Sequence, residues 1–274
     1  MKNSANFSVL MSVYCKEKPE YLKEAIESVL KQTLMPKEIV LVEDGPLTEE
    51  LYDVIEELKK NCNIIRSVPL KENVQLGRAL AEGVRNCSFD LIARMDTDDI
   101  ATEQRFELQY QYMVEHPEVT VLGGFIEEFD DEDETYRQTK TMPLAGTELM
   151  KYARYRNPIN HMTVMYRKDA VCAVGNYEHF PFLEDYQLWI RLLAKGYKFE
   201  NIPQVLVHAR TNVNIYDRRG GKTYCKQYFK LRKMQREFKL LSWSEYQIAR
   251  ILTYVMTRQS AALRKLVYRK ALRK

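Results

Sequence analysis

Several features that would mark other classes of protein are missing from this 274-residue chain. No apolar run approaches the roughly 18 residues that a membrane span needs, and the opening MKNSAN is too short and polar to begin a signal peptide. The five cysteines are odd in number and never spaced C-x-x-C, which argues against a disulfide framework and a zinc site. The sequence therefore predicts a cytoplasmic protein with reduced thiols.

Acidic residues are scarce in the C-terminal part of the chain. From Arg218 onward there are 17 Lys and Arg residues but only two acidic ones, Glu237 and Glu245, whereas residues 1–217 hold 25 basic and 36 acidic residues. Glycine is absent from Lys222 to Lys274, where only helical patterns occur. We therefore expect an acidic globular body and a basic helical segment, 222–274, that meets phosphates or an anionic membrane surface.

The first 100 residues alternate strand and helix patterns. Strands are predicted at 7–14, 38–42, 63–68 and 89–95, and helices follow Pro19, Thr48 and Gln75. Such alternation predicts an α/β fold with a mostly parallel central sheet flanked by helices, whose ligands bind at the carboxyl ends of the strands. Tyr14, Asp44 and Asp96 all fall at such ends.

Beyond residue 100 the pattern is mixed. Helices are predicted at 103–115 and 185–195, the second ended by Gly196, and strands at 119–122, 162–166 and 204–207.

An apolar strand runs directly into three carboxylates at Asp96-Thr97-Asp98-Asp99. Because alternate side chains of an extended chain share a face, Asp96 and Asp98 are expected to point together and Asp99 away. Two convergent carboxylates favour Mn²⁺ or Mg²⁺ bound together with a nucleotide diphosphate. The same D-x-D pattern at 131–133 has no strand before it and is interpreted as a solvated acidic loop.

These motifs, together with Glu43-Asp44-Gly45 and the run Phe182 to Trp189 (FLEDYQLW), resemble the glycosyltransferase family 2 enzymes of bacterial polysaccharide assembly. The chain is most similar to the branch with amylovoran-type, exopolysaccharide and O-antigen transferases, which share its SVLMSVY start and RRGG element. The resemblance implies a GT-A fold over 1–221, with a nucleotide-binding half at 1–100 and an acceptor-binding half at 101–221. It also implies a nucleotide-sugar donor, a divalent metal and inversion at the anomeric carbon.

Several residues are candidates for the donor site. Asp44 could accept the N3–H of a uracil that also contacts the backbone of Ser12, Val13 and Tyr14, or it could only cap its turn. Arg78 could bind phosphate or lie on the surface. Arg94 and Asp96 are assigned to the same site, and Arg218 and Arg219, on a loop ending in two glycines, could close over the diphosphate.

Glu184 and Asp185 begin a predicted helix, where the unpaired amides favour ionised carboxylates. By resemblance, Asp185 is the general base and Glu184 positions the acceptor; the alternative is an ordinary acidic helix start. His208, at the end of a predicted strand, could complete the shell of the metal with Asp96 and Asp98. His161 could face the acceptor or satisfy a hydrogen bond in the core.

The expected function is transfer of a hexose, from a donor expected to be UDP-linked, to a saccharide or lipid-linked saccharide in cell-surface polysaccharide synthesis. One alternative is a sugar nucleotidyltransferase, although that class has a glycine-rich loop where Val13–Lys18 has no glycine. A second is a non-catalytic, membrane-associated scaffold.

The C-terminal segment carries an apolar stripe: Ile248, Ile251, Leu252 and Val255. This stripe either lies on an anionic leaflet, making the protein peripheral on the inner membrane face, or packs on its own domain. No motif for nucleic acid accompanies the basic charge.

Overall fold

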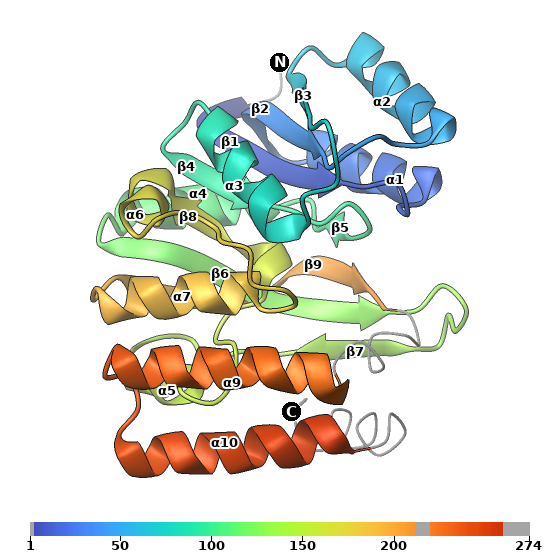
Figure 1. The fold of residues 1–274 in the computed structure, drawn as a ribbon. Helices are drawn as coiled ribbons and strands as arrows, with labels where there is room; N and C mark the ends of the chain where they lie inside the picture. Colours follow the sequence, from blue (N-terminus) through green and yellow to red (C-terminus); the bar gives the residue numbers. More distant parts are fainter. Residues whose placement is uncertain (1–2, 212–219, 260–274) are drawn as a thin grey trace.

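A computed structural model describes residues 3–211 and 220–259 of the chain as strands and helices around one central sheet (Figure 1). The first half contains β1 (Asn3–Val13), α1 (Pro19–Leu30), β2 (Leu34–Glu43), α2 (Glu49–Asn61), β3 (Ile65–Pro69), α3 (Leu76–Asn86) and β4 (Leu91–Arg94). Each of these elements was predicted. The second half contains β5 (Ile100–Ala101), α4 (Arg105–Glu115), β6 (Val119–Phe129), β7 (Arg137–Lys140), α5 (Gly146–Ala153), η1 (His161–Thr163), β8 (Met165–Arg167), α6 (Lys168–Ala173), α7 (Glu184–Ala194), β9 (Lys198–Arg210), α9 (Gly221–Glu237) and α10 (Trp243–Arg258).

The helices of the first half begin where the sequence places a start signal. Pro19 occupies the first turn of α1, and the Thr48 side chain accepts a hydrogen bond from the Leu51 amide at the start of α2. The alternating apolar residues of β1 divide between two cores. Phe7, Val9, Met11 and Val13 pack with α1, α2 and α4 on one face, and Leu10 packs with α3 and α7 on the other.

The sheet is mixed rather than parallel throughout. Described strands follow the order β3-β2-β1-β4-β8-β6-β9-β5, with β7 on β6. The neighbours among β3, β2, β1 and β4 are parallel, as predicted, and so are β6 and β9. β8 joins β4 to β6 by antiparallel pairing. β5 pairs antiparallel with β9, and β7 pairs antiparallel with β6. The carboxyl ends of β1, β2 and β4 therefore meet at one edge, where β5 and β9 bring in the second half of the chain.

The C-terminal helices form two further layers below α7 (Figure 1). Leu231 of α9 packs with Leu183, Tyr186 and Ile190 in a small apolar cluster. The Arg232 guanidinium donates to the carbonyls of Arg154 and Tyr155 at 2.9 and 2.6 Å. α10 packs on α9 and begins with a capping box at Ser242 and Glu245. α9 is therefore part of the packed body.

In the part of the chain that the structure describes, no helix is long and apolar enough to cross a bilayer.

Candidate active site

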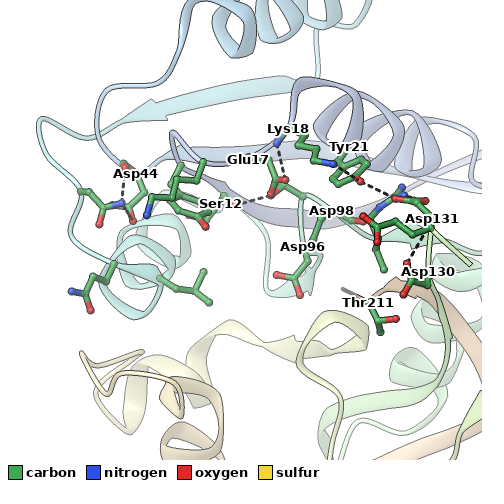
Figure 2. A pocket seen from close by; sticks show the side chains of 18 residues that line it. Ser12, Glu17, Lys18, Tyr21, Asp44, Asp96, Asp98, Asp130, Asp131 and Thr211 are labelled. Carbon is green, nitrogen blue, oxygen red and sulfur yellow. Dashed lines mark hydrogen bonds and ion pairs between the residues drawn. The ribbon is translucent and has the colours of Figure 1, made fainter. Parts of the chain in front are cut away.

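A cavity of about 670 Å³ opens at the carboxyl edge of the parallel strands (Figure 2). Figure 2 shows Asp44 at one end, Asp130 and Asp131 at the other, and Asp96 and Asp98 between them. Its lining comes from the end of β1 and the loop after it, the first turn of α1, the end of β2, the start of α3, the acidic loop after β4, the β6–β7 hairpin and the end of β9. The lining residues are Ser12, Tyr14, Lys16, Glu17, Lys18, Tyr21, Asp44, Asn73, Gln75, Leu76, Asp96, Thr97, Asp98, Asp130, Asp131, Glu132, Arg210 and Thr211.

Asp44 is buried at the end of β2 and is held by the loop that precedes α3. Its carboxylate accepts from the Val74 amide at 2.7 Å and from Asn73 Nδ2 at 3.1 Å. Burial raises the pKa of Asp44, and the backbone donors oppose this shift. The next residue must be small, because a Cβ on Gly45 would lie 2.5 Å from the Asn73 nitrogen, and its φ is +86°. The carboxylate is thus fixed in place at the wall of the cavity.

Asp96 is fixed by a buried arginine. The Arg94 guanidinium donates through both terminal nitrogens to the two carboxylate oxygens of Asp96, and its side chain is 3% exposed. Burial alone would lower the pKa of Arg94, but the adjacent Asp96 carboxylate raises it above its usual value. Arg94, predicted as a donor-binding residue, therefore has its charge engaged by Asp96 and orients that carboxylate.

Asp99 was expected to point away from Asp96 and Asp98, and this expectation is wrong. One carboxylate oxygen from each of the three residues lies within 4.8 Å of the others. The reason is local: β4 ends at Arg94 and the chain bends at Thr97 and Asp98, so strand alternation does not continue through the acidic segment.

The three carboxylates form a suitable set of ligands for a hard divalent cation. Burial, followed by repulsion from Asp96 and Glu17, raises the pKa of Asp98 to about 7. Burial and the charges of Asp98 and Asp96 raise the pKa of Asp99 well above its usual value. Such mutual repulsion between oxygen ligands is relieved by a bound cation, and carboxylate oxygens are the ligands that Mg²⁺ and Mn²⁺ prefer. The residues present therefore fit a divalent metal.

Arg210, which was not selected from the sequence, connects this acidic segment to its surroundings. Its amide donates to Asp99 Oδ1 at 2.8 Å and its Nε to the Asp98 carbonyl at 2.9 Å. Its terminal nitrogens donate to Glu24 of α1, at 2.6 Å, and to Asp131. The guanidinium is 8% exposed. One buried side chain thus ties the carboxylate segment to α1 and to the β6–β7 hairpin.

The acidic loop at 130–132 is part of the cavity and not only a solvated surface loop, as the sequence had suggested. Asp131 pairs with Arg210 and accepts from the Tyr21 hydroxyl at 2.8 Å. The hydrogen bonds from these two partners overcome the effect of burial and lower the pKa of Asp131. The loop therefore places the ionised Asp131 carboxylate at the end of the cavity remote from Asp44.

Glu184 and Asp185 lie at the start of α7. Asp185 accepts from Asn157 Nδ2 at 2.5 Å and from the Tyr186 amide at 2.6 Å. Burial raises the pKa of Asp185 despite these donors, and burial and Asp185 together raise the pKa of Glu184 to about 7. Neither residue is among the described cavity lining, but Asp96 adds to the raised pKa of Glu184, so the start of α7 lies within electrostatic reach of the carboxylate cluster.

The starts of α3 and α7 approach each other closely at Gly77. A Cβ there would lie 2.4 Å from the Glu178 carbonyl and 3.3 Å from Glu184 Cβ, so a larger residue would push the two helices apart. Gln75 and Leu76, directly before Gly77, line the cavity. The cavity and the start of α7 are therefore adjacent.

The remaining predicted residues are distributed around this region. Ser12 and Tyr14 line the cavity. Val13 is buried in the core and Arg78 is exposed on α3, and neither belongs to the lining that the structure describes.

His208 Nδ1 lies 3.2 Å from Glu127 Oε1, and its place in the metal shell stays a prediction. His161 Nε2 lies 2.9 Å from the Tyr177 hydroxyl, a hydrogen bond of the interior. Arg218 and Arg219 lie outside the described residues.

Comparison with known proteins identifies the fold and the chemistry. The model of the glycosyl transferase family 2 matches residues 8–174. The chain belongs to this family. The resemblance inferred from the motifs is thereby confirmed, and the enzyme is a glycosyltransferase.

Two curated relatives of this family 2 glycosyltransferase match almost over their whole length. It is 40% identical over 253 residues to the amylovoran biosynthesis glycosyltransferase AmsE of Erwinia amylovora, covering 91% of this chain and 94% of the relative. It is 34% identical over 275 residues to the UDP-Gal:alpha-D-GlcNAc-diphosphoundecaprenol beta-1,3-galactosyltransferase of Escherichia coli, covering 99% and 98%.

Solved structures confirm the GT-A fold. The S. aureus TarS fragment 1–349 in complex with UDP-GlcNAc superposes with a TM-score of 0.67 at 16% identity, over 91% of this chain and 72% of that one. The mannosyltransferase PcManGT of Pyrobaculum calidifontis, in complex with GDP-Man and Mn²⁺, gives a TM-score of 0.64 at 13% identity, over 97% and 80%.

Three site residues of this family 2 enzyme, Glu17, Gln75 and Arg210, were not selected from the sequence. Glu17 accepts from the Thr97 hydroxyl at 2.6 Å and lines the cavity, but it lies in a loop without periodicity. Gln75 takes a left-handed φ of +70° before α3, a backbone strain that no residue pattern announces. Arg210 had one available signal: an arginine at the end of a strand that returns to the carboxyl edge.

Proposed function

We propose that this glycosyltransferase is a metal-dependent, inverting hexosyltransferase that uses a UDP-sugar and extends a lipid-linked saccharide. The observation that carries the proposal is the carboxylate cluster of Asp96, Asp98 and Asp99, placed between the Asp44 end of the cavity and the start of α7. In this arrangement the nucleobase would lie at Asp44, the diphosphate at the carboxylate cluster, and the reacting sugar near the start of α7.

The uracil specificity rests on Asp44. An ionised carboxylate accepts the N3–H of uracil, and its two hydrogen bonds from Asn73 and Val74 favour the ionised form that this role requires. The E. coli relative is named for UDP-Gal, and the TarS structure holds UDP-GlcNAc. These relatives support a UDP donor, whereas GDP-Man in PcManGT shows that the fold alone does not choose the base.

The transfer step is a single displacement. Asp185 takes the proton from an acceptor hydroxyl as that oxygen forms a bond to the sugar C1, and the bond from C1 to the diphosphate breaks on the opposite face. Asn157 and the Tyr186 amide orient the Asp185 carboxylate, and burial raises its pKa toward the range that suits a general base. Glu184, next to it, positions the acceptor.

Asp96, Asp98 and Asp99 would hold the divalent cation, Mn²⁺ or Mg²⁺, with His208 as a further candidate ligand. When bound, the cation neutralises negative charge on the diphosphate leaving group. Arg94 keeps Asp96 in the orientation that this requires. Arg218 and Arg219, outside the described residues, are proposed to contact the same diphosphate.

The acceptor is proposed to be a saccharide carried on a lipid diphosphate in bacterial cell-surface polysaccharide synthesis. The E. coli relative is named for such an acceptor, and the E. amylovora relative for amylovoran biosynthesis. The enzyme would then work peripherally at the inner face of the cytoplasmic membrane. In this division of the chain, residues 1–100 hold the nucleotide, residues 101–221 the acceptor, and residues 222–274 form a basic extension.

The test is a donor screen with the full-length protein. UDP-hexoses and GDP-mannose are compared with and without Mn²⁺, and nucleotide release and transfer to a GlcNAc-diphospholipid analogue are measured. We expect Mn²⁺-dependent release of UDP and a product whose anomeric configuration, read by NMR coupling, is opposite to that of the donor. Use of GDP-mannose alone, or a retained configuration, would contradict the UDP and inverting proposals respectively.

The same assay addresses the two alternatives. Membership of family 2 removes the basis for a sugar nucleotidyltransferase, which would instead form a nucleotide-sugar from a nucleoside triphosphate. A scaffold without catalytic activity would release no UDP from any donor.

A further inference from the structure

The polarity of helix α10 is inverted relative to that of an ordinary surface helix. The residues that it buries are small or polar, Ala249, Thr253 and Thr257. Its large apolar residues face outward and are about half exposed or more: Trp243 (67%), Ile248 (50%), Ile251 (64%), Leu252 (50%), Tyr254 (51%) and Val255 (48%). A water-facing helix normally buries its apolar stripe, so this face is built to meet an apolar environment.

Specific polar contacts fix the rotation of α10 about its axis. Arg232 Nε of α9 donates to Thr253 Oγ1 at 3.4 Å. At the first turn, Glu245 pairs with Arg154 at 2.6 Å. Turning the apolar stripe inward would break these contacts and bury large side chains where small ones fit. The outward orientation therefore belongs to the folded state.

The charge of the two C-terminal helices selects the kind of partner. From Lys222 to Arg258 the chain has nine basic residues and two acidic ones. Lys222, Lys226, Lys230 and Lys233 recur every three or four residues on α9 and are exposed. A second copy of the chain docked symmetrically through α10 would bring two such basic surfaces together. An anionic lipid surface instead offers apolar chains to the stripe and negative headgroups to the lysines.

We propose that the outward face of α10 inserts into the interfacial layer of an anionic membrane, with the lysines of α9 contacting lipid headgroups. This docking rests on the proposed function only for its purpose, which is to bring the enzyme to a lipid-linked acceptor. It reconciles the two interpretations of the C-terminal segment: α9 packs on the domain, and α10 presents its stripe to the lipid.

The chain contains its own reporter for this docking. It has two tryptophans, of which Trp189 is fully buried in the core and Trp243 lies on the α10 face. Phosphatidylcholine vesicles with and without phosphatidylglycerol are added to the full-length protein. We expect a blue shift of tryptophan emission and quenching by brominated lipid chains only with the anionic vesicles, and neither in Trp243→Phe. No change with anionic vesicles would overturn the proposal.

The apolar face is tested by Ile248→Ser, Ile251→Ser and Val255→Ser combined. Because these side chains are exposed, the triple variant should keep the unfolding temperature and the rate of donor hydrolysis in the absence of vesicles. Its partition onto anionic vesicles should fall by about tenfold or more, since three apolar side chains no longer enter the lipid. Val114→Ser, an equally exposed position on α4, is the matched control and should bind as wild type does.

Three outcomes would contradict the assignment of the face. Equal vesicle binding by the triple variant would mean that charge alone attaches the enzyme. If wild type is a dimer in solution and the triple variant is a monomer, the partner of the α10 face is a second copy of the chain. Protection of Trp243 from acrylamide in the monomer without vesicles would mean that another part of the chain covers α10. Loss of UDP release in the donor screen, with vesicle binding intact, would refute the proposed function but not this docking.

Discussion

The carboxyl edge of the sheet and the C-terminal helix pair differ from ordinary burial in opposite ways. At the edge, charged groups are drawn inward and held: Arg94 by Asp96, and Asp99 by the Arg210 amide. On α10, apolar groups are turned outward, while Thr253 and Thr257 are buried. In each region the unusual placement costs free energy in the isolated protein, through repulsion between carboxylates or through exposed apolar surface.

A bound ligand would remove both the repulsion between carboxylates and the exposure of apolar surface. A cation and a diphosphate would satisfy the carboxylate edge, and lipid would cover the apolar face. The comparison teaches that both proposed functional surfaces of this chain depart from ordinary burial, and that the two departures have opposite sign. The following predictions test whether the two regions depend on each other and what fixes each one.

The largest effect is expected from removing the helix pair. Truncation after Gly221 exposes Leu183, Tyr186 and Ile190 and leaves the carbonyls of Arg154 and Tyr155 without their donor Arg232. Each large apolar side chain that loses its burial costs about 1.5–3 kcal/mol. We therefore expect the truncated protein to be recovered as insoluble material, or to unfold at a much lower temperature by calorimetry.

The matched control is a shorter truncation after Gln259, which keeps every described contact of α9 and α10. It should unfold close to the wild-type temperature. If the longer truncation is equally stable, α9 is not a structural part of the enzyme and the distinction between a packed α9 and an outward-facing α10 fails.

The second-largest effect is expected from replacing Asp185, the proposed general base. Asp185→Asn keeps the shape and the contact with Asn157 but cannot take a proton, so transfer should fall by about 10² or more while UDP affinity stays within a few-fold. Because burial raises the pKa of Asp185, wild-type transfer should decline as the pH falls toward that value, where the carboxylate becomes protonated. Initial rates of wild type and variant over a series of pH values measure both effects.

Glu184→Gln is the matched control, since it removes the same charge one residue away. If Glu184 positions the acceptor, the variant should raise the acceptor KM more than it lowers kcat. Near wild-type turnover by Asp185→Asn together with loss of turnover by Glu184→Gln would reverse the two roles.

The smallest effect should come from Arg210→Lys, which keeps the charge but cannot reach Asp98, Glu24 and Asp131 at once. Loss of one charge-assisted hydrogen bond costs about 1.5–3 kcal/mol, and part of this loss should appear as roughly tenfold weaker Mn²⁺ binding by calorimetry. Arg85→Lys, at an exposed pair with Glu82 on α3, should bind Mn²⁺ as wild type does. Equal binding by both variants would show that Arg210 does not position the carboxylates.

The sequence predicted what local patterns encode. Strand and helix periods located β1 to β4 and α1 to α3, and Thr48 marked the start of α2. It missed β5, which has two residues, and β7, whose sequence Arg-Gln-Thr-Lys has no apolar alternation, because pairing with neighbours distant in sequence creates them.

The same limit applies to the site. The D-x-D segment and Asp44 were visible as polar residues at strand ends, but Arg210 joins the site only because β9 returns beside β5. Asp99 was misplaced because the chain bends where the strand pattern was assumed to continue. For α10, the periodicity revealed the apolar stripe but not that Ala249, Thr253 and Thr257 would occupy the buried side.

The most direct test of the central claim is a calorimetric titration of UDP in the presence of Mn²⁺ into wild type, Asp98→Ala and, as control, Asp133→Ala from the D-x-D pattern of the acidic loop. Because burial and neighbouring carboxylates raise the pKa of Asp98 to about 7, its removal should leave the unfolding temperature unchanged or higher. The account predicts Mn²⁺-dependent UDP binding by wild type and Asp133→Ala and its loss in Asp98→Ala. Unchanged UDP affinity in Asp98→Ala would contradict the assignment of this cluster as the metal-diphosphate site.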